Sequence, residues 1–180
     1  MRLFVAIDLP EETKKVLQKV QAVLPRAQMS KAGGFHLTLK FLGDCDDELK
    51  VKVEKELKEV KFNPFEANLQ EIGTFGGSHP RVVWIGLKCP ESIFETVKEM
   101  EMRMANLGFA VANRFVPHLT LARIKYVKNS RDFLEELNKI SVAEICGDVN
   151  VMKFTVKEFF LFQSQLSSSG AVYTKLAKFS

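Results

Sequence analysis

The tetrapeptide His-Leu-Thr-Leu occurs twice in the chain, at His36–Leu39 and at His118–Leu121, although the sequence has only three histidines. Alternate residues of a strand point to the same face, so each copy would place its histidine beside its threonine and its leucines opposite. A single copy is typical of the wetter face of a half-buried strand. Two copies with the same spacing in a histidine-poor chain instead indicate one shared site.

The residue types of this repeat suit acid/base chemistry on a phosphodiester. An imidazole with a pKa near 6.5 can accept or donate a proton near neutral pH, so two rings can serve the attacking and the leaving oxygen. Threonine hydroxyls can donate hydrogen bonds to the nonbridging phosphate oxygens. We therefore predict a catalytic set of His36, Thr38, His118 and Thr120. We expect no metal and no cofactor, because no His, Cys or carboxylate cluster has metal-ligand spacing.

Two basic residues after the motifs are candidates for substrate binding. Lys40 shares strand parity with the first histidine and threonine, so it is predicted to extend a positive face, with a solvated lysine as the alternative. Arg123 has the opposite parity to the second motif, so a phosphate role needs a bend or a strand end there. The alternative for Arg123 is a surface or loop-anchoring role. Core packing is expected for Phe41 and Phe75, in preference to base stacking, and an exposed turn for His79.

The elements that must position these residues alternate between strands and helices. Apolar residues at helical spacing, such as Val16, Leu17 and Val20, and Gly/Pro turn signals such as 76–80 mark the boundaries. This order, with hairpin-like strand pairs, favours an α+β fold with antiparallel sheets over a doubly wound parallel sheet. The predicted strands cover about 3–7, 35–42, 65–75, 82–87, 117–124, 151–162 and 171–179, and the helices about 10–24, 46–60, 90–108 and 130–140.

Composition sets the broad class. The chain has 180 residues, of which 46% are hydrophobic and 27% charged, which is ordinary for a globular protein with one large domain or two lobes sharing a core. No linker is apparent, so residues 1–180 are expected to form a single domain. No segment approaches the roughly 20 apolar residues of a membrane span. Three scattered cysteines favour a reducing, cytoplasmic location, and a net charge of +4 is compatible with a nucleic-acid substrate.

Five stretches carry a family resemblance that covers nearly the whole chain: 2–10, 35–43, 80–86, 115–123 and 166–173. On these the sequence resembles the 2H phosphoesterase superfamily, named for two His-x-Thr-x motifs. More narrowly, it is similar to the RNA 2′,3′-cyclic phosphodiesterases of archaea and bacteria, also called 2′-5′ RNA ligases. The resemblance implies that residues 1–180 form a single bilobal domain, with two antiparallel sheets related by a pseudo-twofold axis, a cleft between them, and helices on the outer faces.

The resemblance also implies an activity, that of an RNA 2′,3′-cyclic 3′-phosphodiesterase that leaves a 2′-phosphate. His36 matches the proton donor and His118 the proton acceptor, although the near-symmetric site makes these roles hard to distinguish. The expected partners are RNA 3′ ends, tRNA pieces among them, or nucleotide 2′,3′-cyclic phosphates, bound by a monomer. Reversal would give 2′-5′ ligation. The alternatives are an RNA- or nucleotide-binding module with little turnover, and a phosphodiesterase for small cyclic nucleotides or 2′-5′ oligonucleotides.

Overall fold

The computed structural model describes residues 1–167 and 170–180, and in these residues nine strands alternate with five α-helices and one 3-10 helix. The elements are β1 (Arg2–Asp8), α1 (Glu11–Ala22), β2 (Gln28–Lys31), β3 (His36–Asp44), α2 (Asp47–Lys58), β4 (Phe65–Phe75), β5 (Val82–Lys88), α3 (Glu91–Asn106), β6 (His118–Tyr126), α4 (Ser130–Leu137), α5 (Val142–Cys146), η1 (Val149–Met152), β7 (Lys153–Val156), β8 (Phe159–Ser167) and β9 (Gly170–Phe179).

The strands form two antiparallel sheets that meet at their edges. One sheet has the order β7-β4-β5-β6 and the other the order β3-β1-β8-β9, and β2 adds to β6 beside the junction. The two sheets join where β3 meets β6, and the register there consists of one residue pair, Leu37 with Leu119. The expected α+β fold with two antiparallel sheets is therefore confirmed, with the sheets continuous through one narrow contact.

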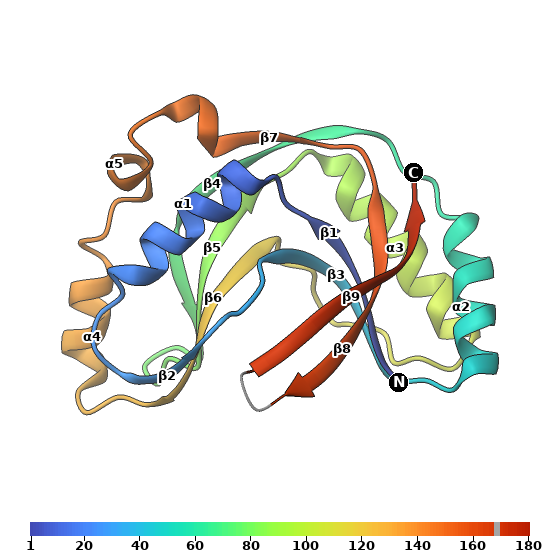
Figure 1. Cartoon of the computed structure of the whole chain (residues 1–180), viewed down its shortest axis with the longest axis horizontal. Coiled ribbons are helices and arrows are strands. Elements are labelled where there is room, and N and C mark those ends of the chain that lie inside the picture. Colours follow the sequence, from blue (N-terminus) through green and yellow to red (C-terminus); the bar gives the residue numbers. More distant parts are fainter. Residues whose placement is uncertain (168–169) are drawn as a thin grey trace.

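A pseudo-twofold axis passes through this junction. Leu37 and Leu119 hold the same position in the two motifs, so their antiparallel pairing relates β3 to β6, β1 to β5 and α1 to α3. The helices divide accordingly between two sides. Figure 1 shows α1, α4 and α5 beside β4, β5 and β6, and α2 and α3 on the side of β1, β3 and β9. Each half of the chain thus supplies one motif strand to the middle of the molecule.

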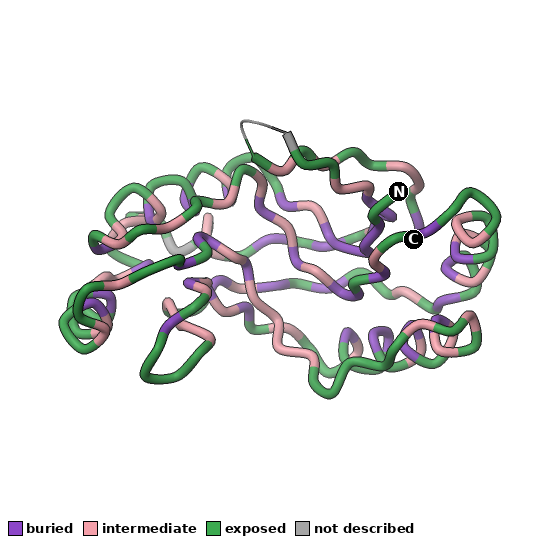
Figure 2. The backbone as a smooth tube through the Cα atoms, turned by 90° about the horizontal axis from the view of Figure 1, so that it is seen from below, coloured by how far each residue is buried: buried purple, intermediate pink, exposed green. Residues whose placement is uncertain are grey.

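The main apolar core lies between the helices and the sheets. Val16, Leu17 and Val20 form the buried face of α1, and the leucines of both motifs point into the same core. Figure 2 shows the buried stretches running along the strands and on the inner sides of the helices. A smaller cluster of Phe4, Ala6, Phe160 and Phe162, with Tyr173 packed against it, lies on the opposite face of β1 and β8. This second cluster therefore faces the site rather than the core.

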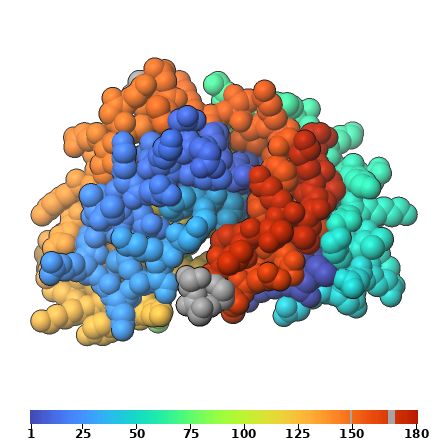
Figure 3. All heavy atoms as spheres, in the orientation of Figure 1, coloured from blue at the N-terminus to red at the C-terminus, as the bar shows by residue number. Residues whose placement is uncertain are grey.

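The C-terminal hairpin of β8 and β9 closes one side of the molecule. β8 pairs with β1 along residues 2–6, so the last strands of the chain lie beside the first. In the space-filling view of Figure 3 the red C-terminal residues approach the blue N-terminal residues from across a hollow. His36, the first motif histidine, lines a pocket between these two parts of the chain.

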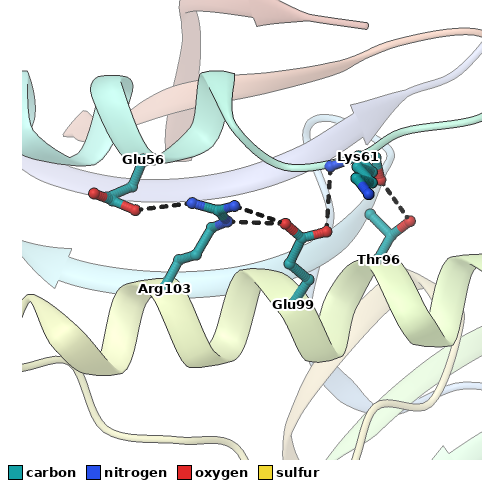
Figure 4. Close-up of polar contacts among 5 residues, drawn as sticks. All are labelled: Glu56, Lys61, Thr96, Glu99 and Arg103. Carbon is teal, nitrogen blue, oxygen red and sulfur yellow. Dashed lines mark hydrogen bonds and ion pairs between the residues drawn. The ribbon is translucent and has the colours of Figure 1, made fainter.

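Polar contacts fix α2 against α3 on the outside of the second sheet. Arg103 of α3 lies 3.2 Å from Glu56 of α2 and 2.9 Å from Glu99 one helical turn away. Glu99 accepts a hydrogen bond from the backbone N–H of Lys61, and Thr96 donates to the Lys61 carbonyl (Figure 4). These contacts attach the chain that follows α2 to the long helix that precedes the second motif.

Most predicted elements are confirmed, with one clear error. The strand expected over 151–162 is two strands, β7 and β8, because β7 pairs with β4 in one sheet and β8 with β1 in the other. The break at Lys157 and Glu158 lets the chain cross between the sheets. β2 and α5 are additional elements. The sequence Ser-Ser-Ser-Gly at 167–170 predicts a turn, and its residues Ser168 and Ser169 lie outside the described residues. In the described part of the chain no helix is both long and apolar enough to span a membrane.

Candidate active site

The two motif strands lie side by side in the middle of the molecule. Because β3 and β6 are antiparallel at Leu37 and Leu119, the next residue in each direction brings His36 toward Thr120 and Thr38 toward His118. All four side chains are half buried, whereas the intervening leucines are buried in the core. The structure thus places the four predicted catalytic residues on one face.

A β-bulge interrupts each motif strand at the same position. In β3 the pairing with β1 skips Leu39, and in β6 the pairing with β5 skips Leu121. The extra residue reverses the facing of the residues that directly follow it. The burial of the two strands follows the same order, with two consecutive buried residues and then an exposed one. The exposed residue is Phe41 in β3 and Arg123 in β6.

The bulge in β6 brings Arg123 to the site. On a regular strand Arg123 would face away from His118 and Thr120. The bulge turns it back to their face, so Arg123 can contact a phosphate bound there. The positive charge of Arg123 lowers the pKa of both motif histidines, which is consistent with a position near both rings. In the described residues the guanidinium makes no ion pair, so its charge remains available to an anion.

The bulge in β3 removes Lys40 from the site, so its predicted role on a positive substrate-binding face is wrong. Lys40 turns to the opposite face and is buried, because the skipped residue changes the parity on which the prediction depended. Its Nζ atom lies 2.5 Å from Oε2 of Glu101 on α3 and donates a second hydrogen bond to the carbonyl of Ala110. The cation is therefore satisfied by the protein itself.

The Lys40–Glu101 pair connects the two motifs. Glu101 also accepts a hydrogen bond from the backbone N–H of Ala112 at 3.2 Å. Ala110 and Ala112 belong to the segment that runs from α3 to the second motif, so one buried ion pair ties β3 to α3 and to that segment. In the other half Gln21 of α1 donates to the carbonyls of Ala32 and Leu121 and holds the bulge of β6.

The tautomer of His118 follows from one hydrogen bond. Its Nδ1 atom lies 2.6 Å from the carbonyl oxygen of Val116, and because a carbonyl only accepts, Nδ1 carries a proton. In the neutral ring Nε2 then has the free lone pair. Burial lowers the pKa of His118, the Val116 carbonyl acts in the opposite direction, and Arg123 lowers it further. The ring is therefore held as a neutral base in the free protein.

Aromatic rings fix the position of His118. Phe75 meets the imidazole edge to face at 4.9 Å, and Trp84 lies 6.2 Å from it. The indole of Trp84 lies over Gly73 of the neighbouring strand, where a Cβ atom would come within 2.2 Å of the ring. Only glycine leaves room for the indole at this position. The expectation that Phe75 packs rather than stacks on a base is consistent with its contacts to Trp84 and His118.

Aromatic rings also surround His36. Its ring centroid lies 4.8 Å from Phe4, 4.9 Å from Tyr173 and 6.1 Å from Phe162. The pKa of His36 is lowered to about 4, mainly by burial; Arg123 and His118 contribute to this lowering, and Asp8 opposes it. The free protein therefore holds His36 neutral at pH 7.

Asp8 occupies a position that the sequence did not indicate. Asp8 lies at the end of β1, two residues before the N-cap Pro10 of α1, and accepts a hydrogen bond from the N–H of Leu9. Asp8 pairs with His36 in the register of β1 and β3. Burial raises the pKa of Asp8, but hydrogen bonds from Lys175 and Lys14 outweigh it and the net shift is downward. The matching position on β5 is Gly86, so the negative charge is present on the His36 side only.

Phe41 is a second departure from expectation. Its side chain is 65% exposed on the site face, because the bulge turns it out of the core in which it was expected to pack. The hydroxyls of Thr38 and Thr120 make no hydrogen bond to any described residue, so both are free to donate to a ligand. No group of three or more His, Cys, Asp and Glu side chains in the described residues is placed to hold a metal ion. His79 lies exposed in its turn, as expected.

Comparison with known proteins agrees with this geometry. A sequence model of the family described as LigT like Phosphoesterase matches residues 7–84 and 87–173, which include both motif strands. The chain belongs to the LigT-like phosphoesterase family. The resemblance inferred from the five stretches is thereby confirmed, and the two-motif face described above is the part of this LigT-like protein that lies at its pseudo-twofold axis.

Relatives of the LigT-like chain extend over its full length. It is 34% identical over 176 residues to a protein of Methanocaldococcus jannaschii named RNA 2′,3′-cyclic phosphodiesterase, covering 96% of each chain. The crystal structure of TT0787 of Thermus thermophilus is 27% identical with a TM-score of 0.77, covering 99% of this chain and 97% of that one. E. coli LigT complexed with 3′-AMP is 25% identical with a TM-score of 0.75, covering 98% and 95%.

Proposed function

We propose that this chain is an RNA 2′,3′-cyclic phosphodiesterase that uses His36 and His118 as its acid/base pair. The observation that carries the proposal is the antiparallel meeting of two His-x-Thr strands at Leu37 and Leu119, with Arg123 acting on both rings. The names of the full-length relatives support the substrate class.

His118 is the proton acceptor in the proposed reaction. Its Nδ1 proton is committed to Val116, so Nε2 can take a proton from water. The water oxygen attacks phosphorus and forms a new P–O bond while the bond from phosphorus to O3′ breaks. The product is a 2′-phosphate with a free 3′-hydroxyl, and its nonbridging oxygens accept hydrogen bonds from Thr38 and Thr120. The guanidinium of Arg123 compensates the charge that develops on them.

His36 is the proton donor to the leaving O3′. In the free protein its pKa of about 4 keeps it neutral, so its protonation depends on the bound substrate. A phosphodiester anion beside the ring favours the charged imidazolium and raises this pKa. Once it has given its proton to O3′, the ring is neutral again, as it is in the free protein.

Product analysis tests the proposal. An oligoribonucleotide ending in a 2′,3′-cyclic phosphate is incubated with the protein and a chelator, and the end group is identified by mass spectrometry and phosphatase sensitivity. A 2′-phosphate is expected with the unaltered chain and with His79→Ala, the third histidine, which lies in an exposed turn. His36→Ala and His118→Ala should each lose at least about 100-fold in kcat, the lower range for general acid–base catalysis.

Other results assign another function. Binding of the cyclic-phosphate RNA without turnover would identify a binding module. Turnover only after addition of a divalent metal would rule out the two-histidine mechanism. A 2′-5′-joined product with a 5′-hydroxyl RNA present would show that a 5′-hydroxyl can replace water as the attacking group.

A further inference from the structure

A pocket of about 730 Å³ opens directly beside His36. It lies between α1, the Gly33–Gly34 turn and the inner side of β9, where the blue N-terminal and red C-terminal residues of Figure 3 approach each other. Its volume is within the range of small-ligand sites. His36 and Phe162 form part of its wall, so the pocket is continuous with the aromatic surroundings of the first motif histidine.

The charges of this pocket cancel. Asp8 lies 3.0 Å from Nζ of Lys14 and 2.5 Å from Nζ of Lys175, and Glu11 lies 2.9 Å from the same Lys14. Both lysines are therefore committed to carboxylates. Arg123, which makes no ion pair in the described residues, is not part of the pocket wall. The unpaired positive charge of Arg123 suits the phosphate. The charged groups of the pocket are paired with each other, so the pocket suits a neutral group with many hydrogen-bonding atoms.

The reaction geometry selects that group. Both ring oxygens of a 2′,3′-cyclic phosphate belong to the ribose of one nucleoside, and in-line displacement puts the leaving O3′ opposite the attacking water. With water at His118 and O3′ at His36, that ribose lies on the His36 side. We propose that this terminal-nucleoside pocket, lined by Glu11, Gln18, Gly33, Tyr173 and Lys175, binds the sugar and base of the nucleoside that carries the cyclic phosphate. The proposal rests on the function proposed above.

The pocket wall supplies the contacts that a nucleoside uses. Tyr173 presents its ring beside that of His36 at 4.9 Å and offers an aromatic surface to a base. Gly34 lies against the same ring, where a Cβ atom would come within 3.1 Å of Tyr173. Gln18 and Glu11 are exposed on α1 and can contact hydroxyl or amino groups of the ligand. A single nucleotide with a 2′,3′-cyclic phosphate therefore contains everything this pocket recognises.

Two substitutions fill the pocket without disturbing the core. Gly33→Leu is sterically open, because a Cβ atom there meets only the Ala171 carbonyl at 3.8 Å and the backbone φ is not positive. Gln18→Trp adds bulk at an exposed helix position, and Lys19→Trp is its control, an exposed neighbour outside the pocket wall. Steady-state kinetics with 2′,3′-cyclic AMP and calorimetric binding of adenosine 2′-monophosphate are measured for all of them.

We expect both filled variants to raise KM for 2′,3′-cyclic AMP and Kd for adenosine 2′-monophosphate by about 10-fold or more, with kcat within about threefold and Lys19→Trp unchanged. Normal KM and Kd in both filled variants, with the unaltered chain turning over its substrate, would overturn the pocket and leave the proposed function standing. Weakened adenosine 2′-monophosphate binding, with no turnover even by the unaltered chain, would overturn the function and support the pocket as a nucleotide site.

Discussion

The Nζ atom of Lys40 lies 2.5 Å from Oε2 of Glu101, and both side chains are withdrawn from solvent, with exposed fractions of 4% and 10%. The pair holds the strand of the first motif against the helix and segment that lead to the second. A side chain expected to meet the substrate is therefore part of the framework that sets the distance between the two motifs.

Removing one partner of this pair should destabilise the fold. Lys40→Met leaves the Glu101 carboxylate buried without its cation, so the free energy of unfolding should fall by about 3–5 kcal/mol. Lys40→Met/Glu101→Leu should recover part of this loss, since neither charge then remains buried. Urea denaturation provides the measurement, with Lys52→Met in the exposed Lys52–Glu48 pair as the control. Equal costs for Lys40→Met and Lys52→Met would contradict a structural role.

The pH dependence of kcat/KM should be bell-shaped and acidic. The active form has one neutral and one charged histidine, and in the free protein the pKa values of both lie below 6.5. Both limbs of the kcat/KM profile are therefore expected below pH 6.5, whereas the kcat profile moves to higher pH because bound phosphate favours the charged rings. Initial rates with a substrate whose chemistry is rate-limiting test this. A kcat/KM that stays constant from about pH 5 to 9 would be incompatible with it.

Acid should also reduce the stability of the protein through His36. Its pKa falls from 6.5 in the unfolded chain to about 4 in the folded protein, so between these values the unfolded state binds more protons. Stability from this group is present above pH 6.5 and is lost as the pH falls toward 4, by about 3 kcal/mol. His36→Gln should remove this part of the pH dependence. Urea titrations of both proteins at pH 7 and pH 4 compare them, and parallel losses would exclude His36 as the cause.

Arg123 should affect both the pKa values of the two motif histidines and the rate of the reaction. Arg123→Gln removes a charge that lowers the pKa of His36 and His118, so both values should rise in an NMR titration. The kcat should fall by about 10²–10³, as for loss of a donor to a developing oxyanion. Arg131→Gln, which changes an exposed arginine of α4 paired with Glu135, is the control and should leave both readouts unchanged. Unshifted histidines in Arg123→Gln would place its guanidinium away from the site.

Gly73 should be required for the position of Trp84. Gly73→Ala would place a Cβ atom 2.2 Å from the indole, which must then move away from its place beside His118. Because Trp84 is the single tryptophan of the chain, its fluorescence spectrum reports this movement, and kcat should fall with it. Gly73→Ala/Trp84→Phe should recover activity, since the smaller ring leaves space. Lys52→Ala, at an exposed position of α2 away from the site, serves as the control. An unchanged emission spectrum in Gly73→Ala would show that the ring tolerates the added methyl group.

The sequence predicts the motif strands well because their information is local. Strand alternation is enough to put each histidine beside its threonine, and the two copies are enough to suggest one site. The bulges at Leu39 and Leu121 could not be predicted, since a skipped residue in the pairing leaves the run His-Leu-Thr-Leu unchanged. Lys40 was therefore expected on the site face but lies on the opposite one, whereas Arg123 was expected on the opposite face but lies on the site face.

Other features depend on partners far along the chain. The counterion of Lys40 is 61 residues away, and no local pattern connects Lys40 with Glu101. The same applies to Asp8, because its place beside His36 depends on the pairing of β1 with β3, and its contact with Lys175 depends on the last strand. The division of 151–162 into β7 and β8 is likewise decided by which sheet each piece joins.

The matched bulges have a consequence for how the two halves can differ. They present Phe41 on one side of the axis and Arg123 on the other, at equivalent positions. A site assembled from two identical subunits would be obliged to show the same residue twice, and its two histidines would be indistinguishable. Covalent linkage of the halves removes that obligation. One side can then carry the cation and the other the aromatic ring, so a nearly symmetric framework can bind its substrate in a single direction.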